Sequence, residues 1–290
     1  MRLALRPRRS MLYMPGANAR ALEKARMLPA DSLILDMEDA VAPDAKAQAR
    51  EQIVLAVTEG GYGKREIIVR VNGLDTAWGK DDLYTVAKLP IDGVLLPKVN
   101  SLQEIDAAVT CLTEAGASAE LPIWIMAETA LGMLNIASIA THPRLAGIVM
   151  GTSDLAKEMR VKHTADRIGM LVPLSLCVLA ARANGLEILD GVYLNLEDET
   201  GFCAACEQGK NMGFDGKTLI HPKQIDVTNQ IFSPSGADIN HAREVIQAWE
   251  EARKASKGVV VVNGKLVENL HYEESLRVLA LADAIKERNS

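Results

Sequence analysis

Short apolar runs rich in β-branched residues alternate along this chain with longer amphipathic stretches. The eight runs are residues 11–14, 33–37, 67–71, 94–97, 123–127, 148–150, 191–194 and 218–220. The stretches with helical periodicity are residues 20–27, 45–58, 80–88, 102–115, 133–140, 173–184, 199–212 and 222–231. Such alternation is typical of a parallel sheet covered by helices. Eight units in about 230 residues predict a closed (β/α)8 barrel of the TIM type rather than an open, doubly wound sheet.

The sequence after residue 232 departs from this alternation. A helix is expected over residues 238–256, followed by an apolar run over residues 258–262. Asn263-Gly264 is a hairpin-turn signal, residues 266–267 would form the return strand, and a last helix is expected over residues 272–287. We therefore predict a barrel over residues 1–232 and a helix–hairpin–helix appendage over residues 233–290 that acts as a lid or a subunit arm.

Composition and charge exclude several classes of partner. The net charge is −6 and aromatic residues make up 4% of the chain, which argues against nucleic-acid and anionic-membrane binding. No apolar run is long enough to span a membrane, and no signal-peptide core is present. The cysteine content is low, so a cytoplasmic location is expected. The basic start, Arg2, Arg6, Arg8 and Arg9, is a local exception that could meet a phosphate-bearing ligand.

Polar residues follow the predicted strands at the barrel end where active sites lie. They are Asp36, Glu38 and Asp39 after the second run, Arg70 at the third, Lys98 after the fourth, Glu128 after the fifth, Asp154 after the sixth and His221 after the eighth. Carboxylates without a nearby Cys or His cluster suit Mg²⁺, or Mn²⁺, rather than zinc. Glu128 and Asp154 come from adjacent strands and could supply the metal ligands, and Arg70 offers a planar fork for a substrate carboxylate.

Each of these residues also has a structural interpretation. Asp39 could cap a helix or form an ion pair, and Asp154 could cap the helix that follows it. Arg70 could be paired with Glu38, and His221 could stabilise a turn before Pro222. Glu128 is harder to explain in this way, because a carboxylate in its apolar surroundings is costly to bury without a cation.

Eight motifs spread along the chain resemble those of one family. They are RRSMLYMPGANARALEKA, LILDMEDAVAPDAKAQAR, VRVNGLDT, LLPKV, IMAETALG, GTSDLA, LDGVYLNLEDETGF and GFDGKTLIHPKQI. Together they resemble the HpcH/HpaI aldolase superfamily, in its branch of citrate lyase β-subunits and malyl-CoA or citramalyl-CoA lyases. The resemblance extends nearly from end to end.

The resemblance implies a Mg²⁺-dependent barrel that usually assembles as a trimer or hexamer. Arg70 matches the arginine that holds the substrate acid, Glu128 and Asp154 match the metal ligands, and Glu38 and Asp39 match acids near the metal. The residues that match positions contacting coenzyme A are Tyr13, Asn18, Lys24, Ile220 and His221. Asn18 replaces an arginine found in some relatives.

The segment GVVVVNGKLVENLH resembles the lid of free-standing CoA lyases, in which an aspartate from a neighbouring subunit completes the site. Glu268 occupies that position here. The implied function is cleavage of citramalyl-CoA or malyl-CoA to acetyl-CoA and pyruvate or glyoxylate. The alternatives are a citrate lyase β-subunit that cleaves a citryl thioester to oxaloacetate, and a malyl-CoA thioesterase or malate-synthase-like enzyme. A scaffold without activity is disfavoured, because binding alone would not need Arg70, Glu128 and Asp154 together.

Overall fold

The structure is a computed structural model that describes residues 6–255 and 258–289. The chain divides into two compact units, one built on Arg8–Phe232 and the other on the residues from Ser233 onward. In the described part of the chain, no helix combines the length and the apolar character that crossing a membrane requires.

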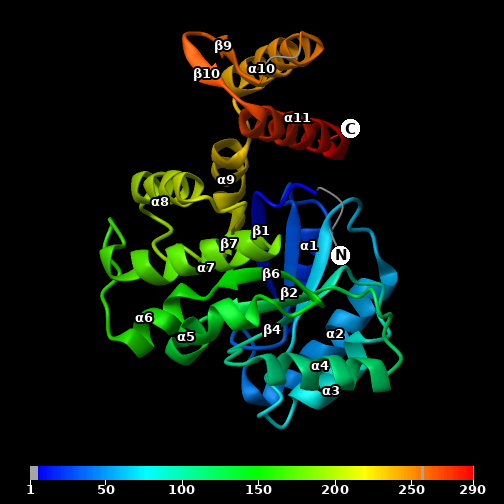
Figure 1. The fold of residues 1–290 in the computed structure, drawn as a ribbon. Helices are drawn as coiled ribbons and strands as arrows, with labels where there is room; N and C mark the ends of the chain where they lie inside the picture. The colour runs from blue at the N-terminus through cyan, green and yellow to red at the C-terminus, as the bar shows by residue number, and fades with distance from the viewer. Residues whose placement is uncertain (1–5, 256–257, 290) are drawn as a thin grey trace. The chain divides into compact units, whose positions relative to one another are not determined.

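The first unit is a closed barrel of eight parallel strands (Figure 1). The strands are β1 (Ser10–Pro15), β2 (Ser32–Asp36), β3 (Glu66–Arg70), β4 (Gly93–Leu96), β5 (Ile123–Ala127), β6 (Leu145–Met150), β7 (Glu187–Asp190) and β8 (Gly216–Leu219). Each strand pairs with the next, and β8 pairs with β1 to close the ring. The predicted (β/α)8 class is therefore confirmed.

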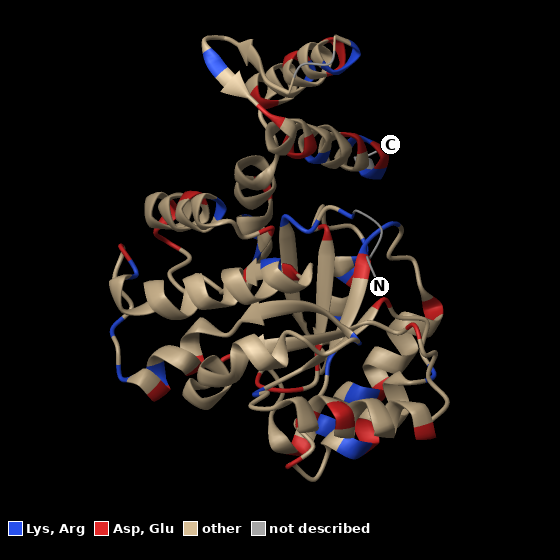
Figure 2. Ribbon diagram, in the orientation of Figure 1, with Lys and Arg blue, Asp and Glu red and all other residues tan. Residues whose placement is uncertain are grey.

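Helices surround the barrel on its outside (Figure 1). They are α1 (Ala19–Ala25), α2 (Lys46–Glu59), α3 (Gly79–Val86), α4 (Leu102–Glu114), α5 (Ala130–Ile139), α6 (Thr152–Met159), α7 (Leu171–Asn184), α8 (Glu199–Met212) and α9 (Ile225–Phe232), with short 3-10 turns at Pro43–Ala45, Ile168–Met170 and Pro222–Gln224. The helix α6 was not among the predicted stretches. Basic and acidic residues both occur on α2 and α3, whereas the charged residues of α4 are all acidic (Figure 2).

The seventh strand was predicted at residues 191–194, and this was wrong. The strand is β7 at Glu187–Asp190, and the residues that follow it form a loop. The helix α7 ends at Gly185 in the left-handed conformation (φ 68°), and the chain becomes extended two residues later. A strand that begins and ends with an acid does not stand out as an apolar run.

Asp190 is buried and Glu187 is partly buried, and both have basic partners, which explains why they are tolerated. Glu187 lies 3.4 Å from Arg8, and Asp190 lies 2.8 Å from the ammonium of Lys217. Arg167 donates to both oxygens of Asp190, each at 2.8 Å. Buried charges persist in proteins when they are paired in this way.

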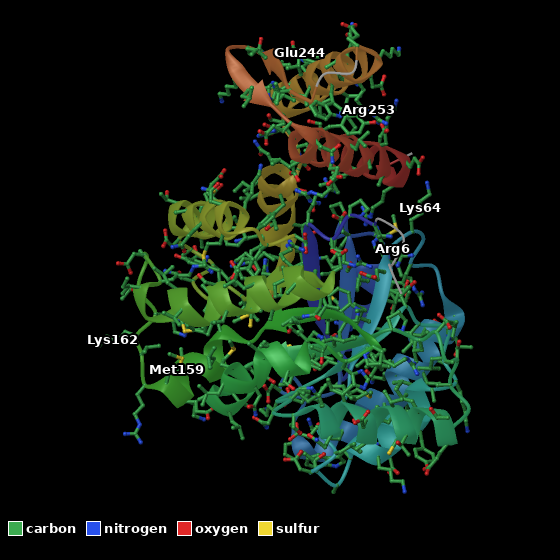
Figure 3. All side chains as sticks on the ribbon, in the orientation of Figure 1. Arg6, Lys64, Met159, Lys162, Glu244 and Arg253 are labelled. Carbon is green, nitrogen blue, oxygen red and sulfur yellow. The ribbon has the colours of Figure 1, made fainter. Side chains whose placement is uncertain are left out.

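The barrel interior is filled with apolar side chains. They are Met11, Ile34, Ile68, Leu95, Trp124, Met126, Val149 and Leu189. Alternate residues of the strands face outward into a second apolar layer beneath the helices, and side chains fill both layers (Figure 3). Gly147 makes room for the ring of Trp124, because a Cβ at this position would overlap that ring. Exposed side chains such as Lys162, in the loop after α6, extend outward (Figure 3).

The basic start of the chain is part of the barrel's packing. Arg8 and Arg9 are 3% and 5% exposed. Arg8 donates to both oxygens of Glu66 at 2.8 and 2.6 Å, and Arg9 donates to Asp31 at 2.8 Å. The idea that these two arginines meet a phosphate-bearing ligand is therefore wrong. Arg2 lies outside the described residues.

The second unit consists of two helices and a hairpin. These are α10 (Gly236–Lys254), β9 (Val260–Val262), β10 (Lys265–Val267) and α11 (Asn269–Asn289) (Figure 1). The strands are antiparallel, and both turn residues, Asn263 and Gly264, have positive φ, as the predicted hairpin requires. Trp249 packs with the hairpin in a small apolar core. The predicted end of the first helix, Ser256, lies outside the described residues.

Candidate active site

A cavity of about 290 Å³ opens among the residues that follow the carboxyl ends of the strands. Six predicted site residues line it, namely Tyr13, Asp39, Arg70, Glu128, Asp154 and Ile220. Met126, Met150 and Val192 give the same cavity apolar walls. Val192 was predicted to lie in the seventh strand, but it belongs to the loop after β7, and from that loop its side chain lines the cavity. The cavity therefore combines charged groups with an apolar surface, as small-molecule sites do.

Arg70 is the last residue of β3, and the strand register places it beside Asp36 at the end of β2. Its Nε and Nη2 donate to the two oxygens of Asp36 at 2.7 and 2.6 Å, and its Nη1 lies 3.0 Å from Glu38. Burial disfavours the charge, but Asp36 and its neighbours hold the pKa of Arg70 well above its ordinary value. Asp36 occupies the edge formed by Nε and Nη2, and Glu38 lies beside Nη1, so a further carboxylate would have to use the second N–H groups of Nη1 and Nη2.

Glu38 and Asp39 form an acidic pair on the loop after β2. Glu38 is 7% exposed and contacts both Arg70 and the ammonium of Lys98. Asp39 is more exposed and lies 3.4 Å from the same ammonium. Burial raises the pKa of Glu38, which the nearby cations partly offset. The hydrogen bond to Glu38 raises the pKa of Lys98 above its ordinary value although burial lowers it, so Lys98 is a cation at neutral pH.

Glu128 follows β5 directly and is 2% exposed. Its Oε1 accepts a hydrogen bond from the backbone N–H of Lys98 at 2.8 Å. Burial raises the pKa of Glu128 to about 7, and the charge of Arg70 only partly offsets the effect of burial. A carboxylate held in such surroundings gains from a positive ion beside it.

Asp154 lies in the first turn of α6, whose N-cap is Gly151, so Asp154 is not the cap of that helix. A Cβ at Gly151 would overlap Oε2 of Glu128, so the glycine keeps a space free beside this carboxylate.

Within residues 6–255 and 258–289, no three Asp, Glu, His or Cys side chains are arranged to hold a metal ion. Two carboxylates fit Mg²⁺, which is commonly held by one or two carboxylates, water and substrate oxygens.

Tyr13, expected to contact coenzyme A, lies in the barrel mouth beside Arg70. The Arg70 guanidinium carbon is 4.9 Å from the centre of the Tyr13 ring, and the Tyr13 hydroxyl lies 3.3 Å from the sulfur of Met126. Burial raises the pKa of Tyr13. Ile220 lines the same cavity and is 38% exposed. Both residues therefore line the cavity that contains the arginine and the carboxylates.

Three other residues expected to contact coenzyme A do not line this cavity. Asn18 is the N-cap of α1, where its side chain accepts from the N–H of Ala21 at 3.0 Å. His221 caps the turn at Pro222–Gln224 by accepting from the N–H of Lys223 at 3.1 Å, which is the turn role considered for it above. Lys24 is exposed on α1. Contact with coenzyme A stays a prediction for all three.

Glu268 belongs to the second unit. It follows β10 and precedes α11, and its side chain is exposed. Its backbone N–H donates to Nδ1 of His271 at 3.0 Å, which fixes the start of α11. Its catalytic role stays a prediction.

Lys46 holds the backbone of the acidic loop in place, and no sequence pattern singled it out. Its ammonium donates to the carbonyl oxygens of Met37 and Glu38 and to the side chain of Asn72, at 2.8, 2.7 and 2.7 Å. Asn72 in turn donates to Asp82 at 2.6 Å. Lys46, Asn72 and Asp82 are all buried. This network fixes the backbone that carries the acidic pair.

Asp36 and Lys98 are the site residues that sequence reasoning left without a role. Both follow or end predicted strands, which was the signal used for the other residues. A further signal for Asp36 was its position two residues after Ile34, which faces the barrel interior. That it pairs with Arg70 depends on the register between β2 and β3.

Comparison with known proteins gives a consistent result. Residues 9–222 match the sequence model of a family described as HpcH/HpaI aldolase/citrate lyase. The chain is 52% identical over 279 residues to a (3S)-malyl-CoA thioesterase of Cereibacter sphaeroides, covering 96% of each protein. It is 35% identical over 287 residues to the citrate lyase subunit beta of Escherichia coli K12, covering 96% of this chain and 94% of that one.

The fold is also similar to that of a solved structure. This is the CitE protein of Mycobacterium tuberculosis in complex with magnesium, acetoacetate and coenzyme A. The TM-score is 0.77 at 26% sequence identity, and the match covers 98% of this chain and 100% of the other.

Proposed function

This chain belongs to the HpcH/HpaI aldolase/citrate lyase family, and from that premise we propose that it is a Mg²⁺-dependent carbon–carbon lyase of CoA thioesters. The substrate is citramalyl-CoA or malyl-CoA, and the products are acetyl-CoA and pyruvate or glyoxylate. One observation carries the proposal: Arg70, Glu128 and Asp154 line a single cavity. An arginine fork and two carboxylates suit a substrate with a carboxylate next to a hydroxyl group, together with a hard cation.

The family relatives support magnesium and a CoA thioester as ligands. The Mycobacterium tuberculosis protein was solved with both magnesium and coenzyme A, and Mn²⁺ is the natural substitute for Mg²⁺ at an oxygen site. When bound by Glu128 and Asp154, the cation would stabilise negative charge on the substrate oxygen. Arg70, oriented by Asp36, would hold the substrate carboxylate.

The reaction breaks the bond between the hydroxyl-bearing carbon and the carbon next to the thioester. The hydroxyl group loses its proton, and its carbon becomes the carbonyl of the oxo acid. The bonding electron pair stays on the acetyl-CoA carbon, which then takes up one proton. We assign the donation of that proton to Glu268 of another copy of the chain. The active enzyme would then be a homo-oligomer, a trimer or hexamer, and we place it in the cytoplasm.

A second candidate is hydrolysis of malyl-CoA to malate and free CoA. It is favoured by the similarity to the Cereibacter sphaeroides protein, which is named as a thioesterase. Here water adds to the thioester carbonyl and the carbon–sulfur bond breaks. The third candidate, a citrate lyase subunit that needs partner chains, is supported by the more distant similarity to the Escherichia coli protein.

A stopped assay of the purified protein with citramalyl-CoA and malyl-CoA, with and without Mg²⁺, separates these candidates. Oxo acid and acetyl-CoA in equal amounts, dependent on Mg²⁺, is the expected result. Free CoA without acetyl-CoA would instead identify a thioesterase. No turnover of either ester, with activity restored by a carrier-linked substrate, would identify a citrate lyase subunit.

Glu128→Ala tests the metal ligand. It should lower turnover by about 10³-fold or more, since this carboxylate provides half of the protein's ligands to the cation. Glu120→Ala is the matched control, because Glu120 is exposed on the loop before β5. Wild-type turnover by the Glu128 variant would refute the assignment.

A further inference from the structure

Lys98 has a backbone conformation that few residues other than glycine adopt. Its φ is 51°, in the left-handed region. Its N–H donates to Glu128 at 2.8 Å, and its carbonyl oxygen accepts from Nδ2 of Asn100 at 2.8 Å. The other side-chain atom of Asn100 accepts from the hydroxyl of Thr129 at 2.6 Å, next to Glu128. Hydrogen bonds at both its N–H and its carbonyl oxygen thus stabilise the strained backbone of Lys98, and such strain is common at functional sites.

The side chain of Lys98 reaches carboxylates from two separate elements. Its ammonium contacts Glu38, lies 3.4 Å from Asp39 and 4.0 Å from Asp154. Glu38 and Asp39 belong to the loop after β2, whereas Asp154 belongs to α6. Through its backbone and its side chain, Lys98 therefore touches or approaches four carboxylates at once.

These acids repel one another, and Arg70, which lies 3.0 Å from Glu38 and 3.9 Å from Asp39, offsets that repulsion on the side of the β2 loop. The ammonium reduces that repulsion, because it lies between the β2 loop and α6. A divalent cation on Glu128 and Asp154 would come close to the ammonium, and two positive charges at this distance repel. The Lys98 side chain is 46% exposed, so it has space to move, while its backbone is fixed.

We propose that Lys98 is a positioning residue that acts as a built-in counter-cation for this acidic site. Its ammonium holds Glu38, Asp39 and Asp154 in place before a divalent cation binds, and it moves away from Asp154 when the cation arrives. Lys98 therefore stabilises the metal-free protein and weakens metal binding. The inference rests on the metal site of the proposed function, but its test does not depend on turnover.

The test compares Lys98→Met, which keeps the length and removes the charge, with Lys98→Arg, which keeps the charge. Lys88→Met is the matched control, since Lys88 is an exposed lysine after α3 and outside the cluster. Binding of Mn²⁺ is measured from the electron paramagnetic resonance signal of free Mn²⁺. The thermal midpoint is measured for each variant in EDTA and in saturating Mn²⁺.

Lys98→Met should bind Mn²⁺ about tenfold more tightly than the wild type, because a neighbouring positive charge has been removed. The midpoint temperature of thermal unfolding of this variant should fall in EDTA. The rise in that midpoint on adding Mn²⁺ should be larger for the variant than for the wild type. Lys98→Arg and Lys88→Met should bind Mn²⁺ like the wild type. Equal or weaker Mn²⁺ binding by Lys98→Met would overturn the inference.

Absence of Mn²⁺ binding by the wild type would also overturn the inference about Lys98. The lyase assay is scored separately by its products, so failure of the counter-cation role and failure of the lyase reaction remain distinguishable. A role of Lys98 in packing alone would lower the midpoint in EDTA without tightening Mn²⁺ binding, and that result contradicts the proposal.

Discussion

Replacing Asp36 by asparagine should destabilise the barrel strongly although the size of the side chain is unchanged. Asp36 is 0% exposed and accepts four hydrogen bonds. Two come from Arg70 at 2.7 and 2.6 Å, and two come from the backbone N–H groups of Glu38 and Ala40 at 2.9 and 3.1 Å. The amide would remove the negative charge and place N–H donors against the guanidinium or the backbone.

The magnitude follows from the burial of the pair. Breaking a buried ion pair by removing one partner costs about 3–5 kcal/mol, because the remaining charge is left uncompensated. Glu38 still lies 3.0 Å from Arg70, so we expect the lower end, about 3 kcal/mol. That is a large part of a typical stability of about 5–15 kcal/mol. The double variant Asp36→Asn/Arg70→Met should lose about 2 kcal/mol less than the sum of the single variants.

Urea unfolding in EDTA, followed by far-ultraviolet circular dichroism, measures these free energies. Asp44→Asn is the control, since Asp44 is exposed and the same change should leave stability within about 0.5 kcal/mol of the wild type. A loss below about 1 kcal/mol for Asp36→Asn, or additive losses in the double variant, would show that the pair does not hold the barrel mouth together.

Two further predictions concern the barrel away from the cavity. Burial, and then the charge of Asp215, raise the pKa of Glu187 from 4.5 to about 7. The folded protein therefore loses stability as the pH rises from about 4.5 to about 7, by at most about 3 kcal/mol, because Glu187 ionises less readily when folded than when unfolded. The Glu187→Gln variant should not show this pH-dependent loss of unfolding free energy. If the difference in unfolding free energy between the variant and the wild type were the same at both ends of this pH range, the prediction would be contradicted. Gly147→Ala should lower the thermal midpoint by an amount equivalent to about 1–3 kcal/mol, because its Cβ overlaps Trp124. The control Gly236→Ala, where a Cβ meets open space, should leave the midpoint unchanged, and equal midpoints for both variants would argue against tight packing around Trp124.

Much of the fold could be predicted from local patterns. Apolar runs and amphipathic stretches depend on residues close in sequence, so they identified seven of the eight strands and the hairpin of the second unit. The seventh strand was missed because Glu187 and Asp190 interrupt its apolar pattern. Their partners, Arg8 and Lys217, are distant in sequence, and only the closed barrel brings them together.

The candidate site, too, was predictable where local patterns suffice and unpredictable where contacts join distant residues. That Arg70, Glu128 and Asp154 gather at one end of the barrel follows from the sequence, because parallel strands place all their carboxyl ends on the same side. The sequence could not determine that Asp36 binds Arg70, that Lys98 bridges the acids, or that Asn18 and His221 cap helical turns. Those contacts depend on strand register, on the left-handed backbone of Lys98 and on loop geometry. The barrel, and the end at which its polar residues meet, follow from local periodicity and strand direction, which are both readable from neighbouring residues. Which charge faces which depends on distances between residues far apart in the chain, so it emerges only once the barrel is closed.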